Sequence, residues 1–398
     1  MTVKMLEEQK IILHQGTYKK TATTAEAVFM ITGMTIGAGI LGLPYAIAQV
    51  GLAVGLLYIL VLGIIMLSLQ LMIGEVIVRT GENLQLPGLA GKYLGKWAKF
   101  LLSLTLVSSS YGALLAYIVG EGESLSAMFG GNPLAWSVIF WSVGSFLIWG
   151  GLQRIRKAEK IVSSFVIVLI VCLALFLLPH ADASAIWQVK TTNLFLPFGV
   201  ILFALHGTPA IAEAHALLPG SERRFKKALL LGTLIPILVY MLFAGAVVAV
   251  SGLATTEVAT IGLGEKFGSS MLFFANLFAV LAMSTAFMGL GTALKETLVW
   301  DYKVPKFAAK LLVISLPLAL FLVGARNFIV ILEVVGGLFI ATEGVIMTLV
   351  YWRARARGDV KPRFFASHHA LAIALPGLLF FSMLLITAIA TLVDRFYF

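Results

Sequence analysis

Charged residues are scarce in this sequence. Asp, Glu, Lys and Arg make up 12% of the 398 residues, whereas 60% are hydrophobic and the mean hydropathy is +0.99. Soluble globular domains carry about 25% charged residues, so this chain lacks the side chains for a fully water-facing surface. Apolar stretches of about 20 residues recur along it instead, which is typical of a protein that crosses a membrane many times.

Cysteine is almost absent, because Cys172 is the only one and lies within an apolar stretch. One cysteine excludes an intrachain disulfide and a cysteine-based metal cluster. The six histidines show no metal-ligand spacing, and the sequence contains neither G-x-S-x-G nor H-E-x-x-H. We therefore expect no enzyme and no cofactor apart from a coupling ion.

Eleven apolar spans can be drawn along the chain. They cover residues 25–49, 52–78, 100–120, 134–152, 161–179, 193–217, 228–252, 270–297, 307–324, 327–351 and 370–392. With the N-terminus inside, the inside segments hold all but four of the 29 Lys and Arg residues. Because Lys and Arg concentrate in cytoplasmic loops, this asymmetry predicts a cell-membrane protein with its N-terminus in the cytoplasm and its C-terminus outside. The net charge of +10 is then explained by the cytoplasmic Lys and Arg residues, which also attract anionic lipids of the inner leaflet. We therefore expect no nucleic-acid partner.

The chain reads as one membrane domain. Residues 1–24 are polar and predict a cytoplasmic N-terminal arm, and residues 25–398 contain only loop-sized polar segments. The first five spans fill residues about 25–179, the next five about 193–351, and the eleventh follows at about 370–392.

The first and sixth spans are interrupted by helix-breaking residues, in the stretches TIGAGILGLP and HGTP. Backbone groups freed by such breaks need partners in protein or in a water-lined cavity. Interruptions at matching positions of two halves indicate an inverted-repeat transporter with its site at the midplane. The alternative is that the spacing of Gly33 and Gly37 serves only close helix packing.

TIGAGILGLP also contains a G-x-G-x-x-G pattern from Gly37 to Gly42. A dinucleotide site is excluded, because no strand precedes it and the next acidic residue is Glu75. Backbone N–H groups at the break suit a carboxylate instead. We expect free carbonyls of Phe203, Ala204 and Leu205 to accept an ammonium group, so the two breaks together predict a zwitterionic amino acid as the ligand.

Five ordered stretches resemble bacterial aromatic amino acid permeases. They are TIGAGILGLPYAIAQVG in the first span, YLGKW before the third, AYIVGEGESL at its end, LLPH closing the fifth and FALHGTPAI in the sixth. They also resemble the wider amino acid/auxin permease family and the amino acid–polyamine–organocation superfamily, and the resemblance weakens beyond residue 300. It implies an all-α, leucine-transporter-like fold of 11 helices, in which a five-plus-five inverted repeat is followed by one extra helix.

The resemblance implies a substrate site where the first and sixth helices unwind, flanked by the third and eighth. The corresponding positions for the substrate carboxylate and backbone are Thr35, Ile36, Gly37, Ala38 and Gly39. Those for the amine and side chain are Phe203, Ala204, His206 and Gly207, with Ser109 and Gly112 on the third span.

Similar sodium-coupled transporters hold their cation between carbonyls of the first helix and hydroxyls of the eighth. The corresponding residues are Gly33, Ile36, Leu281, Ser284 and Thr285. The alternative for the two hydroxyls is a bond to a carbonyl of their own helix. Some proton-coupled relatives use a fifth-helix lysine instead, and residues 161–178 contain none, which favours sodium.

A proton remains the alternative coupling ion, because intramembrane carboxylates are costly and histidine titrates near physiological pH. Candidate proton or gate residues are His206, Glu333, Glu343 and Glu75, whereas Glu121 and Glu123 are expected at the extracellular surface.

We therefore expect a monomeric secondary active transporter that imports a neutral or aromatic L-amino acid with sodium by alternating access. A proton-coupled aromatic amino acid permease is the alternative. A transporter-like receptor that senses an amino acid without moving it would have the same site. No charged ring or repeated carbonyl filter favours a channel.

Overall fold

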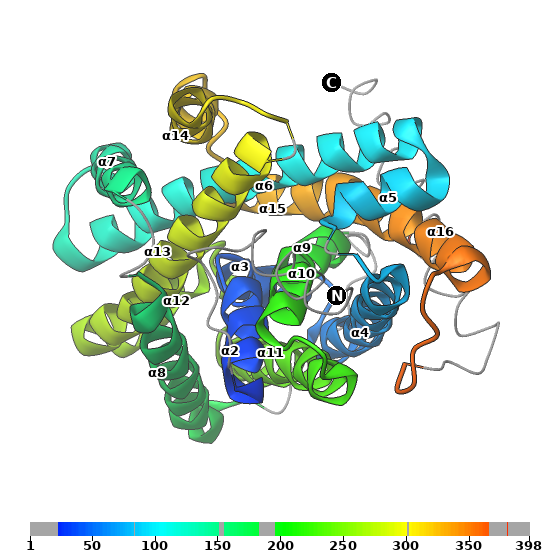
Figure 1. Ribbon diagram of the computed structural model, residues 1–398. Coiled ribbons are helices and arrows are strands. Elements are labelled where there is room, and N and C mark those ends of the chain that lie inside the picture. The colour runs from blue at the N-terminus through cyan, green and yellow to red at the C-terminus, as the bar shows by residue number, and fades with distance from the viewer. Residues whose placement is uncertain are drawn as a thin grey trace, which may run out of the picture.

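The computed structural model describes residues 23–82, 84–150, 155–182, 196–300, 302–365 and 380. Every regular element in these ranges is a helix (Figure 1). The first half contains α2 (Thr24–Thr35), α3 (Gly39–Ala48), α4 (Leu52–Thr80), α5 (Leu86–Leu94), α6 (Lys96–Phe129), α7 (Pro133–Gly150), α8 (Ile155–Leu177) and the short turn η2 (Leu178–His180).

The second half contains two more interrupted helices. Its elements are α9 (Leu196–Ala204), α10 (Pro209–Leu217), α11 (Glu222–Ser251), η4 (Gly252–Ala254), α12 (Ala259–Phe267), α13 (Ser269–Trp300), α14 (Lys306–Leu322), α15 (Phe328–Val334), η5 (Val335–Ile340) and α16 (Ala341–Arg357). Helices thus occupy the first ten predicted spans, and the eleventh lies outside the described residues apart from Phe380.

Seven helices of the described chain are long and apolar enough to cross a membrane, or eight when the bent pair α2–α3 counts as one span. The bend between α2 and α3 is 55°. Thr23 caps the start of α2, because its hydroxyl accepts from the Glu26 N–H at 3.2 Å while the Glu26 carboxylate accepts from the Thr23 N–H at 2.9 Å. The helix ends at Thr35, directly before the Gly37–Gly39 break.

The interrupted first and sixth spans, α2–α3 and α9–α10, lie in the middle of the molecule. In Figure 1, α2, α3, α9, α10 and α11 occupy the centre, with α4 and α16 on the right, α13 on the left and α6 running across the view above them. Packing is close enough to need glycine, because a Cβ at Gly39 would lie 2.6 Å from the Ala204 Cβ. The two predicted breaks therefore touch each other.

The tenth span contains a wider, π-type turn, η5, between α15 and α16. Glycine allows this turn to meet α9, since a Cβ at Gly336 would collide with the Gly199 carbonyl and lie 2.9 Å from the Phe203 nitrogen. Such turns accommodate one extra residue in a helix and are frequent at functional sites.

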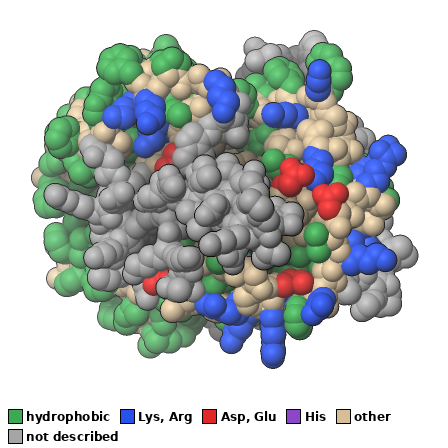
Figure 2. All heavy atoms as spheres, in the orientation of Figure 1, with side chains coloured by type: hydrophobic (Ala, Val, Ile, Leu, Met, Phe, Trp, Pro, Cys, Tyr) green, Lys and Arg blue, Asp and Glu red, His purple; other side chains and the backbone are tan. Residues whose placement is uncertain are grey.

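We call one end of the bundle the α5 face. It carries α5, the start of α11 and the segment after α16, which are joined by Lys92–Asp359 (2.6 Å) and by backbone N–H groups of residues 363–365 that donate to Glu222. Lys and Arg side chains are spread round the side of the molecule shown in Figure 2.

Candidate functional site

A small central cavity lies between the two breaks. Its volume is about 30 Å³, and α2, α3, α6, α9, α10 and α13 contribute to its wall. The lining residues are Met34, Thr35, Gly37, Gly39, Ala113, Tyr117, Phe203, His206, Pro209, Ala286 and Leu290. Five of the residues predicted for the substrate site, Thr35, Gly37, Gly39, Phe203 and His206, are therefore brought together here.

The break in the first span leaves donors without acceptors. Among the described residues, no backbone carbonyl accepts from the N–H groups of Gly37, Ala38 or Gly39, although the next two N–H groups bond to Gly37 O and Ala38 O at 3.4 and 3.0 Å. The start of α3 has no side-chain cap either. A helix N-terminus with unpaired N–H groups is a ready-made site for an anion.

Gly37 must be a glycine for its neighbours to fit. A Cβ there would lie 2.9 Å from the Tyr117 hydroxyl, 3.2 Å from its ring and 3.3 Å from the Ala286 Cβ. The Tyr117 hydroxyl from α6 thus reaches the same break as the unpaired N–H groups, so backbone and phenol donors converge on one wall of the cavity.

The break in the sixth span is different, because its carbonyls already have donors. The Phe203 carbonyl accepts from the His206 N–H at 3.2 Å, and the Ala204 carbonyl accepts from the Tyr240 hydroxyl at 3.0 Å. The Leu205 carbonyl accepts from the Gly207 N–H at 3.0 Å and from the Gln70 amide at 3.4 Å. The prediction that these carbonyls are free is wrong, since the buried chain satisfies them internally.

Tyr240 of α11 links the two breaks. Its hydroxyl lies 2.8 Å from the Thr35 carbonyl and 3.0 Å from the Ala204 carbonyl, and its side chain is fully buried. Gln70 of α4 acts similarly, since it accepts from Thr233 of α11 at 2.5 Å and donates to the second break. Neither residue was predicted from the sequence, because both lie within apolar spans that contain no helix-breaking motif.

A polar cluster closes the second break. His206 Nε2 lies 2.6 Å from the Thr208 hydroxyl and 3.0 Å from Glu343 Oε2, while Thr208 donates a short hydrogen bond to Glu343 Oε1. The Thr208 hydroxyl therefore lies between His206 and Glu343 and contacts both. His206 and Glu343 were predicted separately as proton candidates, 137 positions apart, and the structure brings them together.

The remaining predicted substrate residues lie outside the cavity lining. Ala38 and Ala204 are buried in the contact between the breaks, and Gly207 lies against the Thr35 hydroxyl. On α6, Ser109 bonds the Leu106 carbonyl at 3.0 Å, and Gly112 lies against Val335 of the π-type turn. The α6 residues that line the cavity are Ala113 and Tyr117, which lie further along that helix than Ser109 and Gly112.

A second, smaller cavity occupies part of the predicted sodium site. About 10 Å³ in volume, it is lined by Thr32, Gly33, Ile36, Ser163, Val166, Ile167, Ala282 and Thr285. A space of about 10–15 Å³ holds one water-sized species. The Thr285 hydroxyl also donates to the carbonyls of Leu281 and Ala282, at 3.0 Å each, which matches the alternative of bonding within its own helix.

Ser284 faces elsewhere. Its hydroxyl donates to Glu121 of α6 at 2.8 Å, and it is not part of the cavity lining. Glu121 itself is 0% exposed, so the expectation of a surface position is wrong for this residue. Helix periodicity explains the error, since α6 continues beyond the apolar span and carries residue 121 towards α13.

Glu75 and Glu333 lie apart from the cluster around His206. Glu75 of α4 is buried and accepts from Arg79 at 2.8 Å and from Tyr351 of α16 at 3.1 Å. Glu333 of α15 is partly buried where its backbone lies against Gly199 of α9.

Comparison with known proteins agrees with this geometry. Residues 20–386 match the tryptophan/tyrosine permease family. The chain belongs to that family. It is therefore a multi-pass membrane permease, as its composition predicted, and not an enzyme, as its motifs predicted.

Individual relatives are distant but cover most of the chain. Tyrosine-specific transport system 2 of Haemophilus influenzae is 27% identical over 395 residues, which span 88% of this chain and 93% of the relative. Tyrosine-specific transport system 1 of the same organism is 24% identical, with 83% and 88% covered. Glutamine transporter 2 of Aliivibrio fischeri is 23% identical, with 67% and 73% covered.

The crystal structure of MhsT in complex with L-phenylalanine matches with a TM-score of 0.71. It is 15% identical, and the match covers 93% of this chain and 99% of that one. This likeness concerns the fold alone, and it supports the predicted all-helical, leucine-transporter-like architecture.

Proposed function

We propose that this permease transports an aromatic L-amino acid, such as tyrosine, across the cell membrane by alternating access. The observation that carries the proposal is the set of unpaired N–H groups at Gly37, Ala38 and Gly39, next to a cavity lined by Tyr117 and Phe203. These donors suit the substrate carboxylate, and the two aromatic side chains suit a ring. Two relatives named for tyrosine transport agree with this choice.

The ammonium group has an acceptor in the same region. Glu343 lies directly behind His206, which lines the cavity, and it is the buried carboxylate of the polar cluster. Carbonyls of the second break already have donors, but each carbonyl oxygen has two lone pairs and accepts more than one hydrogen bond. We therefore assign the amine to the side of the cavity formed by Phe203 and His206.

The central cavity is too small for an aromatic side chain as it stands. Its volume of about 30 Å³ corresponds to two or three water-sized spheres. Binding must therefore be accompanied by movement of the lining, and Phe203, Pro209 and Leu290 are placed to move with α9, α10 and α13. Such movement is what alternating access requires of a pair of broken helices.

The overall plan that we propose is an inverted repeat. Repeat one comprises residues about 25–179 and repeat two about 193–351, each beginning with an interrupted helix, and the eleventh helix and the arm 1–24 lie outside the repeats. We place the α5 face in the cytoplasm, because the Lys and Arg bias of the loops predicts it. One subunit contains both breaks, so a monomer suffices for transport.

We propose sodium as the coupling ion, held in the cavity lined by Gly33, Ile36 and Thr285. The small size of this cavity and the neutral oxygen atoms around it support the proposal, because such oxygens suit a hard monovalent cation. Ser163 of α8 supplies a further hydroxyl that the sequence did not suggest. Proton coupling is the second candidate, and the observation that favours it is the buried contact of His206 and Thr208 with Glu343.

Uptake into proteoliposomes tests these proposals. We expect saturable uptake of labelled tyrosine that rises with an inward sodium gradient. If uptake depends on a pH gradient and not on a sodium gradient, the coupling ion is a proton and not sodium. Tight tyrosine binding without uptake under any gradient would make the protein a receptor of the transporter type.

A further inference from the structure

Three helices, α7, α13 and α14, meet at an outer corner of the molecule. In Figure 1, α7 and α14 lie at the edge of the molecule, outside α13. The indole N–H of Trp141 on α7 donates to the Ile314 carbonyl of α14 at 2.8 Å, which joins the two outer helices. Both of them contact α13. We call the end of this corner that carries Trp149, Lys295 and residues 306–310 the α14 corner.

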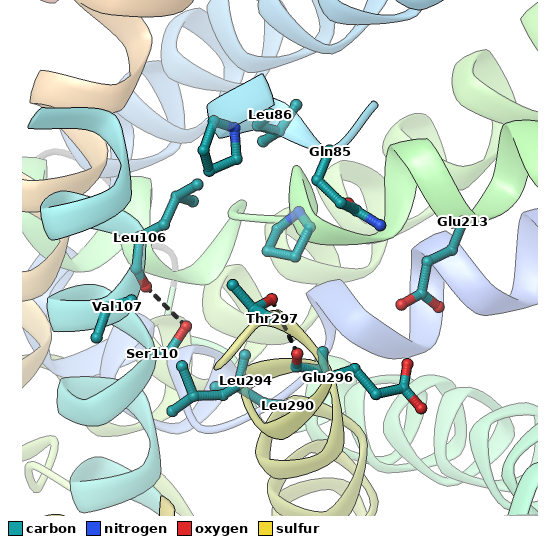
Figure 3. A pocket seen from close by; sticks show the side chains of 13 residues that line it. Gln85, Leu86, Leu106, Val107, Ser110, Glu213, Leu290, Leu294, Glu296 and Thr297 are labelled. Atoms are coloured by element: carbon teal, nitrogen blue, oxygen red, sulfur yellow. Dashed lines mark hydrogen bonds between the residues drawn. The ribbon is translucent and has the colours of Figure 1, made fainter. Parts of the chain in front are cut away.

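The α14 corner lies at the same end of the bundle as the α5 face. Leu294, Glu296 and Thr297 of α13 line a cavity of about 80 Å³ together with Gln85 and Leu86 at the start of α5 (Figure 3). This end of α13 therefore lies beside α5. With the α5 face in the cytoplasm, as proposed above, the α14 corner is at the level of the cytoplasmic lipid headgroups.

Positive charge is in excess at the α14 corner. Lys295 of α13 is partly buried and interacts electrostatically with its neighbour Glu296. It also experiences the charges of Lys306 and Lys310 on α14. Neither of those two lysines forms an ion pair with a described carboxylate. Like charges at short distance repel one another, so an anion that contacts Lys306 and Lys310 would be stabilising.

Lys310 is held in position by the end of α7. Its Nζ atom donates to the Trp149 carbonyl at 3.1 Å and lies 5.1 Å from the centroid of the Trp149 ring. The Phe307 ring packs against the same indole in a T-shaped arrangement, with 5.7 Å between the centroids. An ammonium group has three N–H donors, and within the described chain the Trp149 carbonyl accepts from one of them. The others remain available to a ligand.

Apolar side chains continue from the α14 corner along the outer helices. Phe307 is 62% exposed and Phe146 of α7 is 77% exposed, and Leu311 and Leu312 of α14 are exposed as well. In Figure 2, Lys and Arg side chains at the upper left, over the region of α13 and α14, lie among hydrophobic side chains. Tryptophan is typical of the level where headgroups meet the hydrocarbon. This combination of charge and apolar surface suits an amphiphile better than a free ion.

We propose that the α14 corner binds an anionic phospholipid, with its phosphate on Lys306 and Lys310 and its acyl chains along α7 and α14. Basic pockets between membrane helices on the cytoplasmic side bind such headgroups in other proteins. The proposal goes beyond transport and depends on neither the substrate nor the coupling ion. It has a consequence for the central cavity, because α13 also carries Ala286 and Leu290 of its lining.

Lipid binding to the purified full chain in detergent tests the site. The probe is dioctanoyl phosphatidylglycerol, and the comparison is dioctanoyl phosphatidylcholine, whose choline cation cancels the phosphate charge. We expect native mass spectrometry to show at least about tenfold tighter binding of phosphatidylglycerol. Lys306→Gln combined with Lys310→Gln should weaken that binding about 25-fold, or about fivefold for each lysine, and leave phosphatidylcholine binding unchanged.

A matched control separates the site from the general charge of this end of the bundle. Arg223→Gln combined with Lys227→Gln removes the same charge, at the same four-residue spacing, from two exposed positions at the start of α11 on the α5 face. We expect this variant to bind phosphatidylglycerol within about twofold of the wild-type protein. Equal weakening in the two double variants would overturn the site.

A charge-neutral substitution provides a second test if the lysine variant is unstable. Trp149→Leu keeps an apolar side chain but removes the ring that contacts Lys310, and we expect about threefold weaker binding of phosphatidylglycerol. Unchanged binding in the lysine variant, or in Trp149→Leu when the lysine variant does not fold, would overturn the site.

Two results on the wild-type protein would also overturn the proposal. They are equal affinities for the two lipids, and displacement of phosphatidylglycerol by an equal concentration of inorganic phosphate, which would mean that the lysines bind a free anion. None of these measurements depends on transport. A protein that binds phosphatidylglycerol at the α14 corner but moves no amino acid would contradict the proposed function alone.

Discussion

The breaks in the first and sixth spans differ in how their backbone N–H and C=O groups find hydrogen-bond partners. At the first break, Gly37, Ala38 and Gly39 leave N–H groups unpaired and present almost no side chains. At the second, Tyr240, Gln70 and the Thr208–Glu343 cluster supply partners for nearly every exposed group. Unpaired groups in a buried site are costly unless a ligand completes them. The difference supports our proposal that substrate completes the first break, whereas the protein itself holds the second break in shape.

The largest loss of substrate binding should come from placing a side chain in the break of the first span. We expect Gly37→Val to reduce tyrosine binding at least about 100-fold, because its side chain must displace Tyr117 and Ala286 at a cost of about 3 kcal/mol. Equilibrium binding of labelled tyrosine measures this loss. Gly245→Ala is the control, since its added methyl would meet Leu56 at an ordinary 3.6 Å. If Gly37→Val binds tyrosine as well as the wild-type protein does, the substrate carboxylate does not bind at this break.

The second break should respond to a change in its side chains. Glu343→Gln replaces one acceptor oxygen with a donor, so either Thr208 or His206 loses its partner in a buried site, at about 1–3 kcal/mol. We expect about a tenfold loss of transport together with a lower unfolding temperature, measured by uptake and by thermal denaturation. A loss of transport with unchanged unfolding would mean that Glu343 acts on the substrate or a proton alone.

A smaller effect is expected where the breaks are joined. Tyr240→Phe removes one hydroxyl that serves the carbonyls of Thr35 and Ala204, and we expect it to destabilise the fold by about 1–2 kcal/mol. Denaturant unfolding in detergent would measure this difference. Tyr302→Phe, at a 43% exposed position, should change nothing. Equal stability of both variants would show that the two breaks are not joined through Tyr240.

The smallest effect should lie far from both breaks, on the α5 face. Hydrogen bonds to Asp359 and then Glu82 raise the pKa of Lys92 above its ordinary value of 10.5. The stability that this group contributes is therefore fully present below that ordinary value and is lost as pH rises through the raised pKa. Lys92→Met should cost less than about 1 kcal/mol near neutral pH, and even less at high salt. A large loss of transport in this variant would assign the α5 face a role beyond stability.

The positions of the two helix breaks could be predicted from the sequence, but the side chains that contact them could not. Gly37 and Pro209 could be predicted because glycine and proline within an apolar span have a direct structural meaning. Tyr117 could not, since a choice between Ser109, Gly112 and positions one or two turns further along a helix depends on how that helix is rotated.

Contacts between residues far apart in the chain could not be predicted from the sequence either. His206 and Glu343 were each suspect as polar groups in a membrane, yet only the fold shows that they meet at 3.0 Å. Glu121 was placed at the surface because it follows an apolar span, whereas helix α6 runs on to Phe129 and buries it.

The π-type turn at Val335–Ile340 lies directly before Glu343 and determines which way that residue faces. An α-helix turns by about 100° per residue, so one extra residue in this turn rotates everything after it by about that amount. Loss of a single codon there would leave an uninterrupted α-helix of similar hydrophobicity, but Glu343 would point away from His206. In this chain, the number of residues in the tenth span therefore sets the direction in which Glu343 points, as well as the length of the span.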